Sequence, residues 1–391
     1  MHNGEVYCVL MEIKQTIKIT FIQGVIGCNG VFYLNHALAE ELLQRGYLVE
    51  VIAQEDSNDK FIEFPAGCRL VILRSRNMKH FFIKLVFHLM KSKPSAIFAS
   101  SWPVSVVSAL AARLSNPRGF VFGVEHVDFR TNLDISGEFT NRDKFLLRHV
   151  AKYLYLATTK VICVSVGVAD GLRDTVGLKG DKLVVINNPI RYFRGGANDE
   201  GRLRSALDFW ESGKIKLLSV GRLAKQKNYG LLMEALPLLS FRDDVRLLIV
   251  GEGSERYKLE RQIKKYGLTR NIHLSGGFSD PSPLYRGADL FVMTSSSEGF
   301  GNVLIEALSF GLPIVSTDCL SGPSEILKDG TFGTLTPVND PIALAEAITN
   351  SLSFAHDKVA LRGRALEFMP SVITDKYLDL VGVDTNLNVA S

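Results

Sequence analysis

Short apolar runs alternate with amphipathic segments along most of this chain of 391 residues. Apolar runs of about four to eight residues between turn residues are typical of buried strands, and the segments between them have helical periodicity. This alternation predicts mostly parallel sheets with helices on both faces, which is a doubly wound α/β architecture. The expected strands are Ile17–Ile22, Leu48–Ala53, Arg69–Leu73, Ala96–Ala99, Phe120–Val124, Val161–Ser165 and Leu183–Ile186, then Ile215–Val220, Arg246–Val250, Ile272–Ser275, Leu290–Thr294 and Pro313–Ser316.

The alternation pauses at Pro189–Gly213, which is rich in glycine and charge and has no strong strand pattern. The length fits two to three domains of about 150 residues, so we expect two similar α/β domains joined by this segment. Helical patterns at Ile342–Leu352 and Asp357–Tyr377 are expected to close the second domain. The expected parts are an N-terminal extension at 1–16, a first domain at 17–190, a linker at 191–213, a second domain at 214–365, and a C-terminal helix and tail at 366–391.

Composition excludes several classes of protein. Hydrophobic residues make up 46% and charged residues 22%, with 33 Gly and 13 Pro, which excludes a disordered or collagen-like chain. The five cysteines are widely spaced and form no Cys-x-x-Cys, so they indicate neither a zinc knuckle nor a disulfide framework. The sequence contains no run of about 18 apolar residues, so it predicts no membrane-spanning helix. Its first residues do not resemble a signal peptide. These features favour a cytoplasmic protein.

One stretch of the first domain carries charge of a single sign. No Asp or Glu occurs between Glu63 and Glu125. Two interpretations are open: an ordinary helix that covers the first sheet, or a basic surface at 69–118 that rests on an anionic membrane at the inner face of the plasma membrane. We expect no nucleic-acid partner. The basic residues of the stretch are Arg69, Arg74, Arg76, Lys79, Lys84, Lys91, Lys93, Arg113 and Arg118.

Glycines after the first strand suggest a dinucleotide-binding fingerprint, but their spacing argues against it. Gly24, Gly27 and Gly30 are spaced G-x-x-G-x-x-G, whereas the fingerprint is G-x-G-x-x-G. Glu50 lies inside its strand rather than at the strand's end. A nicotinamide or flavin enzyme is therefore not expected. A glycine turn that lets a phosphate or sugar approach backbone N–H groups remains open.

Three segments of the second domain follow predicted strands and carry the chemistry. They are Ser219–Asn228 with Arg222 and Lys227, the Gly-Glu-Gly turn in Val250–Gly253, and the Glu-Gly-Phe-Gly segment in Ser297–Glu306. Ligands of parallel sheets bind outside the carboxyl ends of the strands. If two such sheets face each other, the site lies in the cleft between them.

The third segment has the pattern of a phosphate cradle. Gly299 and Gly301 allow close approach of the backbone, and a helix is expected over Asn302–Phe310. The unpaired N–H groups and the dipole at the start of a helix favour an anion. Glu306 shares a helix face with Asn302, and its carboxylate suits hydroxyl groups rather than phosphate. Together with two cations on the neighbouring loop, these features predict a site for a nucleotide sugar.

These motifs resemble those of the family 4 glycosyltransferases of the GT-B fold, in which two Rossmann-like domains face each other. The resemblance covers nearly the whole chain after residue 16 and implies an acceptor-binding domain at 17–190 and a donor-binding domain at 214–365. Gly-Arg-Leu-x-x-x-Lys at 221–227 resembles the donor-diphosphate motif, and Glu298-x₇-Glu306 resembles the paired-glutamate motif. Further segments of family type are Val164–Leu172, Asn187–Pro189 and Pro313–Val315.

The resemblance implies a role for each candidate residue. Arg222 and Lys227 would bind the donor diphosphate, Glu298 the donor sugar hydroxyls and Glu306 the ribose hydroxyls. His126, after the strand Phe120–Val124, would line the cleft near the transferred sugar. The catalytic candidates are His126, Arg222, Lys227 and Glu298, and the nucleotide-sugar site would further include Gly24, Gly251, Phe278, Gly299, Phe300, Gly301, Asn302, Val303 and Glu306.

Several of these residues also have purely structural interpretations. His126 also fits a buried, hydrogen-bonded histidine, and Phe278 fits either a residue that flanks the nucleotide base or a packed loop aromatic. Gly251 and Gly253 either contact the donor or only shape a turn. Asp128, close to His126, is a weaker candidate than its neighbour.

The resemblance implies metal-independent transfer with retention of the anomeric configuration. No Asp-x-Asp occurs in the sequence, so no metal is expected to neutralise the leaving nucleoside diphosphate. Arg222, Lys227 and the helix start at Asn302 would do so instead, and such electrostatic stabilisation is usually among the largest catalytic contributions. No pyridoxal phosphate or other cofactor is expected, and the UDP-sugar is a substrate.

The segment Asp318–Leu327 resembles branches of the family that build bacterial surface polysaccharides. This favours a UDP-hexose or UDP-N-acetylhexosamine donor and a glycan acceptor, lipid-linked or of the lipopolysaccharide core. Two alternatives stay open. One is a nucleotide-sugar epimerase or another enzyme of the GT-B fold, and the other is a non-catalytic nucleotide-sugar-binding protein.

Overall fold

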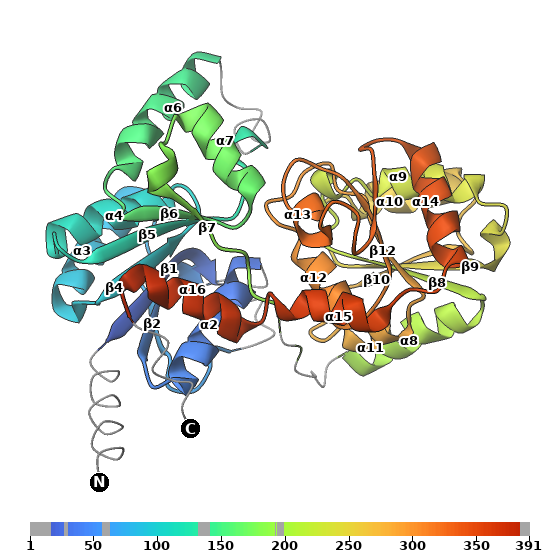
Figure 1. Cartoon of the computed structure of the whole chain (residues 1–391), viewed down its shortest axis with the longest axis horizontal. Helices are drawn as coiled ribbons and strands as arrows, with labels where there is room; N and C mark the ends of the chain where they lie inside the picture. The colour runs from blue at the N-terminus through green and yellow to red at the C-terminus, as the bar shows by residue number, and fades with distance from the viewer. Residues whose placement is uncertain are drawn as a thin grey trace, which may run out of the picture. The chain divides into compact units, whose positions relative to one another are not determined.

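A computed structural model describes residues 17–26, 30–56, 63–131, 141–191, 193 and 199–383, with the side chains of 141–147 outside the description. The N-terminal extension, Gly27 of the glycine turn, and much of the expected linker therefore lie outside the described residues. The chain divides into two compact units (Figure 1). Unit 1 comprises the chain up to Arg191 and the residues from Met369 onward, and unit 2 comprises Tyr192–Phe368.

The described strands of unit 1 form a parallel sheet in the order β3-β2-β1-β4-β5-β6-β7. All seven strands expected in the first half of the chain are present, and helices lie on both faces of the sheet (Figure 1). The strands are β1 (Lys18–Ile26), β2 (Leu48–Asp56), β3 (Arg69–Ile72), β4 (Ala96–Ser100), β5 (Phe120–Glu125), β6 (Lys160–Cys163) and β7 (Leu183–Val185). The helices are α2 (Gly30–Gln44), α3 (Met78–Ser92), α4 (Val104–Ser115), α6 (Asn141–Tyr155), α7 (Val166–Val176) and α16 (Pro370–Val381).

The first strand is longer than the sequence indicates. The expected strand ends at Ile22, but β1 continues through Gly24 and pairs with β2 as far as Ile26. Gly24 is therefore a strand residue and not part of a turn, and a Cβ atom there would lie 3.6 Å from the side chain of Val104 at the start of α4.

Unit 2 repeats the same architecture with a second parallel sheet, in the order β10-β9-β8-β11-β12-β13. Its last strand was not expected from the sequence. The strands are β8 (Ile215–Val220), β9 (Val245–Val250), β10 (Ile272–Gly276), β11 (Leu290–Met293), β12 (Ile314–Thr317) and β13 (Thr334–Thr336). The helices are α8 (Glu200–Glu211), α9 (Gly230–Ala235), α10 (Arg256–Lys265), α11 (Ser282–Gly287), α12 (Asn302–Ser309), α13 (Pro323–Leu327), α14 (Pro341–Ser353) and α15 (Lys358–Leu366).

The C-terminal helix belongs to unit 1. The pattern over Asp357–Tyr377, expected to close the second domain, forms two helices, and only α15 packs within unit 2. The other, α16, packs on α2, where Asp375 pairs with Arg45. The ring of Tyr377 is buried, with its centroid 4.9 Å from that of Phe98 in β4. The last helix thus completes the core of the first unit.

Each sheet reverses its strand order at one point. In unit 2 the neighbours β8 and β11 lead to opposite sides of the sheet, and in unit 1 the corresponding pair is β1 and β4. Loops at the carboxyl ends of such a pair of strands diverge and leave a crevice, which is where doubly wound sheets bind their ligands.

None of the helices within the described ranges is long and apolar enough to span a membrane.

Candidate functional site

The loops that follow β8 and β11 meet at the crevice of unit 2. Lys227 lies in the first loop and Glu298 in the second, and the Lys227 Nζ atom lies 2.5 Å from Glu298 Oε1. Both side chains are largely buried, with exposed fractions of 14% and 9%. Two residues that are 71 positions apart in the sequence are therefore in direct contact, a pairing that the sequence motifs do not predict.

Three hydroxyl groups at the ends of two strands, β11 and β12, hold this ion pair in place. Ser295 Oγ donates a hydrogen bond to Glu298 Oε1 (2.6 Å). Thr294 Oγ1 donates to the carbonyl oxygen of Lys227 (3.0 Å), and Thr317 Oγ1 donates to that of Ser295 (2.6 Å). All three hydroxyl residues are buried, so the positions of the ammonium and the carboxylate are fixed by the ends of β11 and β12.

The second cation of the motif, Arg222, lies at the other end of the same loop. Its side chain is exposed, and no ion pair or side-chain hydrogen bond is found for it among the described residues. The loop begins at Gly221, and the Tyr229 hydroxyl donates to the Gly221 carbonyl oxygen (3.1 Å). Burial raises the pKa of Tyr229, so this hydroxyl remains a donor at neutral pH.

Helix α12 begins beside this ion pair. Its N-cap is Gly301, at φ 97°, and no side chain caps the helix there. Glycine tolerates this left-handed conformation, whereas a side chain would be strained. Asn302 and Val303 form the first turn and are partly exposed, as are Gly299 and Glu298 before it. The expected helix over Asn302–Phe310 is confirmed to within one residue.

The second glutamate of the motif is fixed within unit 2. Glu306 lies on α12 with an exposed fraction of 7%, and the hydroxyl of Tyr285 donates to its Oε2 atom (2.7 Å). Tyr285 is itself buried and stacks on Phe310 at the end of α12. A carboxylate in this environment is oriented by its neighbours and is not a mobile surface group.

Other sequence candidates have structural roles in the loops. A Cβ atom at Gly251 would overlap the carbonyl oxygen of Gly221, and one at Gly253 would overlap that of Leu223, because these loops pack backbone to backbone. Phe300 is 2% exposed and packs edge-on against Phe368.

Phe278 lies in the loop after β10 and is 7% exposed. The Arg202 guanidinium lies over its ring, 5.7 Å from the centroid. Asp199 anchors the same loop by accepting hydrogen bonds from the backbone N–H and the hydroxyl of Ser279 (2.6 and 2.5 Å). The packing gives Phe278 a structural role, and its expected contact with a base remains a prediction.

In unit 1, His126 follows β5 directly. Burial lowers its pKa to about 4, so the imidazole is neutral at physiological pH. Its Nε2 atom is inaccessible to solvent and has no hydrogen-bond partner among the described residues. Its neighbour Glu125 is 4% exposed and accepts hydrogen bonds from the Ser105 hydroxyl (2.6 Å) and the Trp102 backbone N–H (3.0 Å).

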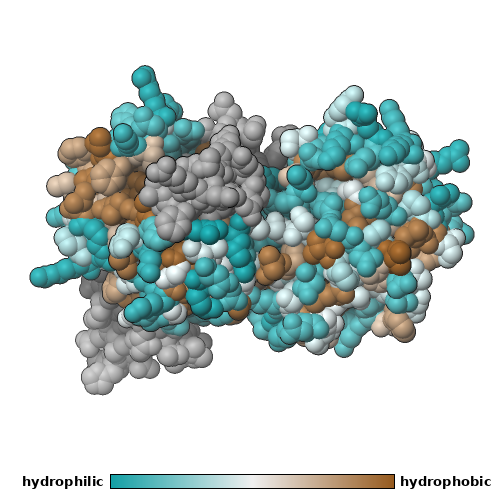
Figure 2. Space-filling model, turned by 90° about the horizontal axis from the view of Figure 1, so that it is seen from above, coloured by the Kyte–Doolittle hydropathy of each residue, from teal (hydrophilic) through white to brown (hydrophobic). Residues whose placement is uncertain are grey.

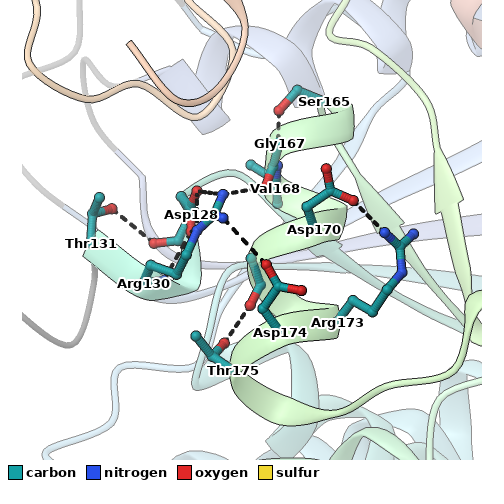
Figure 3. A network of polar contacts seen from close by, with 11 residues as sticks. Asp128, Arg130, Thr131, Ser165, Gly167, Val168, Asp170, Arg173, Asp174 and Thr175 are labelled. Atoms are coloured by element: carbon teal, nitrogen blue, oxygen red, sulfur yellow. Dashed lines mark hydrogen bonds and ion pairs between the residues drawn. The ribbon is translucent and has the colours of Figure 1, made fainter. Parts of the chain in front are cut away.

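Asp128 is held in a network of polar contacts (Figure 3). The Arg130 guanidinium donates to both of its carboxylate oxygens (2.7–3.1 Å), to the Gly167 carbonyl oxygen (3.1 Å) and to Asp174 (3.5 Å). A Cβ atom at Gly171 would overlap the Asp128 carboxylate, so glycine is needed where α7 passes it. This network ties the loop after β5 to α7 and leaves Asp128 a structural residue.

Two residues of the site are not indicated by sequence motifs. Ser295 holds Glu298, and Tyr285 holds Glu306. Ser295 lies three residues before Glu298, so its proximity is detectable in principle, but Tyr285 is 21 positions from its partner and no pattern marks it.

Among the described residues, no group of three or more His, Cys, Asp or Glu side chains is placed to hold a metal ion.

Comparison with known families assigns both halves of the chain. Residues 28–192 match the model described as Glycosyltransferase Family 4, and residues 208–361 match the model described as Glycosyl transferases group 1.

Several individual proteins are similar to much of the chain. Amylovoran biosynthesis glycosyltransferase AmsD of Erwinia amylovora is 25% identical over 317 residues, which is 80% of this chain and 84% of that protein. Lipopolysaccharide core biosynthesis glycosyltransferase LpsE of Rhizobium meliloti is 31% identical over 232 residues, 57% and 64% of the respective chains. The crystal structure of Anabaena HepE in complex with UDP-glucose superimposes with a TM-score of 0.76 at 20% identity and covers 94% of this chain and 99% of that one.

Proposed function

This chain belongs to the glycosyltransferases, with a family 4 domain followed by a group 1 domain in a GT-B fold, and on that basis we propose that it transfers a hexose or an N-acetylhexosamine from a UDP-sugar to a glycan acceptor. The contact between Lys227 and Glu298 carries the proposal, because it brings the motif for a diphosphate and the motif for a sugar to one point at the crevice of unit 2.

The leaving diphosphate is stabilised by three sources of positive charge in unit 2. Lys227 and Arg222 supply two cations, and the first turn of α12 supplies backbone N–H groups and the positive end of the helix dipole. Lys227 and the first turn of α12 are already positioned in unit 2, so they stabilise the charge that develops on the leaving group with little reorganisation. Arg222 adds a second cation from an exposed position in the same loop. The proposal therefore includes transfer that is independent of a metal ion or other cofactor.

The two carboxylates bind the hydroxyl-bearing ends of the donor. Glu298 accepts hydrogen bonds from the transferred sugar, and Glu306 accepts them from the ribose. Hydrogen bonds to a charged acceptor contribute about 1.5–3 kcal/mol each. UDP-glucose in the complex of HepE supports UDP as the nucleotide. No side chain of unit 2 is assigned as a covalent nucleophile, and the family resemblance supports retention of configuration.

The acceptor is a growing surface glycan. The names of AmsD and LpsE refer to amylovoran and to the lipopolysaccharide core, and both support a role in polysaccharide or lipopolysaccharide biosynthesis. We assign acceptor binding to unit 1 and propose that the acceptor is lipid-linked.

The outer face of α3 supports binding to a membrane. Ile83, Phe87 and Met90 recur at helical spacing and are 53%, 64% and 52% exposed. Figure 2 shows apolar side chains gathered at the left of the molecule, the part where Figure 1 draws α3 and α4. An apolar stripe flanked by basic residues suits the interface of an anionic bilayer. Lys84 is not part of this surface, because its ammonium donates to the carbonyl oxygens of Leu73 and Arg74.

The proposal is tested by measuring UDP release from a panel of UDP-sugars with membrane extract as acceptor. Arg222→Ala combined with Lys227→Ala should lower the rate by at least about 10²–10³, the usual effect of removing one transition-state donor. Lys225→Ala is the matched control, because Lys225 lies in the same loop with an exposed side chain. A double variant with the turnover of the wild type would refute the assignment.

The same assay separates the other two functions. A nucleotide-sugar epimerase would release free UDP and an altered sugar without any acceptor. A binding protein would shift its melting temperature with a UDP-sugar and release no UDP.

A further inference from the structure

The crevice rule that locates the donor site in unit 2 also applies to unit 1. There the strand order reverses between β1 and β4. The loop that follows β4 is Ser101-Trp102-Pro103, and α4 begins at Val104. A doubly wound sheet binds ligands at the crevice where its strand order reverses. In unit 1 this crevice lies at the carboxyl ends of β1 and β4, and Trp102 lies in the loop after β4.

The backbone of this loop is strained, and hydrogen bonds to β5 hold it in place. Ser101 has a φ of 65°, a conformation that is costly for a residue other than glycine. Its N–H donates to the Val124 carbonyl oxygen (2.8 Å), and the next N–H, that of Trp102, donates to the buried carboxyl of Glu125 (3.0 Å). Glu125 also accepts from Ser105 of α4. Strain that is retained by such a network is characteristic of functional loops.

These hydrogen bonds place the aromatic ring of Trp102 at the carboxyl end of β4. Trp102 is partly exposed. Its ring packs edge-on against Phe129 (centroids 5.9 Å apart, 83°) and at a tilt against Tyr155 (5.9 Å, 39°). These contacts fix the plane of the indole while part of its surface remains accessible. The other tryptophan of the chain, Trp210, is 1% exposed in unit 2, so the two indoles have opposite environments.

The groups around Trp102 carry little net charge. Burial raises the pKa of Glu125 and lowers that of His126, which favours the neutral form of each. Asp128 is neutralised by Arg130. This edge therefore differs from the crevice of unit 2, where two cations suit a diphosphate. An aromatic ring beside uncharged hydrogen-bonding groups suits a ligand with an apolar face and hydroxyl groups, which is a sugar ring.

We propose that the indole of Trp102 is the surface on which a sugar ring of the acceptor stacks, and that Glu125 is the positioning residue that holds the Trp102 loop. This inference rests on the proposed function and extends it to the acceptor. The C–H groups of a pyranose carry partial positive charge and pack against the negative face of an aromatic ring.

Kinetics separate this role from donor binding. Trp102→Ala should raise the KM for the acceptor about tenfold or more, because the sugar ring loses the aromatic surface on which it stacks. The KM for the UDP-sugar should stay within about twofold, and Trp102→Phe should restore most of the acceptor affinity. Glu125→Gln should raise the acceptor KM without changing the donor KM. A Trp102→Ala enzyme with an unchanged acceptor KM would overturn the proposal.

A second measurement depends on neither turnover nor the natural acceptor. In Trp210→Phe, Trp102 is the only remaining tryptophan. The probes are methyl glycosides of glucose, galactose, N-acetylglucosamine and N-acetylgalactosamine. At least one of them should protect the emission of Trp102 from acrylamide quenching. Trp102→Phe, in which only Trp210 emits, should show no such protection.

The two experiments distinguish failure of this inference from failure of the proposed function. If no glycoside protects Trp102, or if protection persists in Trp102→Phe, the stacking surface is wrong even where UDP release is normal. If a glycoside protects Trp102 but the enzyme releases no UDP with any donor, the sugar site stands and glycosyl transfer fails.

Discussion

At the scale of single residues, Lys227 has two competing partners, the Glu298 carboxylate and the proposed donor diphosphate. A diphosphate that binds Lys227 must compete with the carboxylate that already holds the ammonium at 2.5 Å. Glu298 thus positions the cation and also lowers its availability. The orientation of the pair by Ser295 limits how far either group moves when a donor binds.

Glu298→Gln should therefore separate nucleotide binding from transfer. UDP, which has no sugar for Glu298 to bind, should bind at least as tightly as to the wild type. The kcat/KM with a UDP-sugar should fall about 10- to 100-fold, the equivalent of one charge-assisted hydrogen bond. Calorimetric titration with UDP and initial rates with the UDP-sugar measure the two effects. Glu260→Gln on α10 is the control, and weaker binding of UDP to Glu298→Gln would contradict the account.

His126 should make the stability of unit 1 depend on pH. Its folded-state pKa is about 4, below the ordinary value of 6.5. The unfolded chain therefore takes up a proton first, and stability is lost as the pH falls through this window. The free energy of unfolding, measured with urea, should fall between about pH 7 and about pH 5 in the wild type. In His126→Asn this fall should be smaller by about 1–2 kcal/mol. Equal losses in the two proteins would show that His126 is not buried in its neutral form.

Sequence motifs indicate the charged residues of the candidate site but not the residues that hydrogen-bond to them. Arg222, Lys227 and Glu298 stand out because they follow predicted strands and lie in motifs with the spacing of a known family. Ser295 and Tyr285 are ordinary residues of a strand end and a short helix, and only the folded chain shows which carboxylate each one holds.

At the scale of elements, α3 has two apolar faces. One faces the core through Phe81, Leu85 and Leu89, and the other is exposed. A helix that serves only to cover a sheet needs the first face alone. The second is explained if α3 lies against a bilayer.

Flotation with anionic liposomes tests this face of α3. The wild type should float with the vesicles, and high salt should weaken the binding because each Lys or Arg near an anionic surface contributes about 1 kcal/mol that salt screens. Replacing Arg76, Lys79, Lys91 and Lys93 with Gln should abolish flotation, as should Ile83→Ser with Phe87→Ser. Replacing the exposed Lys264 and Lys265 of unit 2 with Gln should have no effect. Binding that is insensitive to salt would contradict the account.

Elements with strong apolar patterns were the ones that the sequence predicted. All the expected strands are present, but β13 was missed because its three residues, Thr334–Thr336, carry only one apolar side chain. The length of β1 was underestimated because Gly24 resembles a turn residue. The helix α16 was predicted, but its place in unit 1 was not, because it depends on contacts with Arg45 and Phe98 far away in the sequence.

At the scale of the whole molecule, the two units repeat one architecture and differ in the chemistry at the reversal point of each sheet. Unit 2 presents two cations and a helix start, which suit a diphosphate. Unit 1 presents a tryptophan and neutral polar groups, which suit a sugar. The repeat was predictable from the strand–helix alternation, whereas the contrast between the two edges required the hydrogen bonds and the burial of particular side chains.

A crystal structure of the protein with UDP tests the central claim most directly. The account predicts the diphosphate at the crevice of unit 2, with Arg222, Lys227 and the N–H groups of the first turn of α12 within hydrogen-bond distance of its oxygens, and the ribose at Glu306. A diphosphate bound elsewhere, with Lys227 still paired to Glu298 and the start of α12 without an anion, would contradict it.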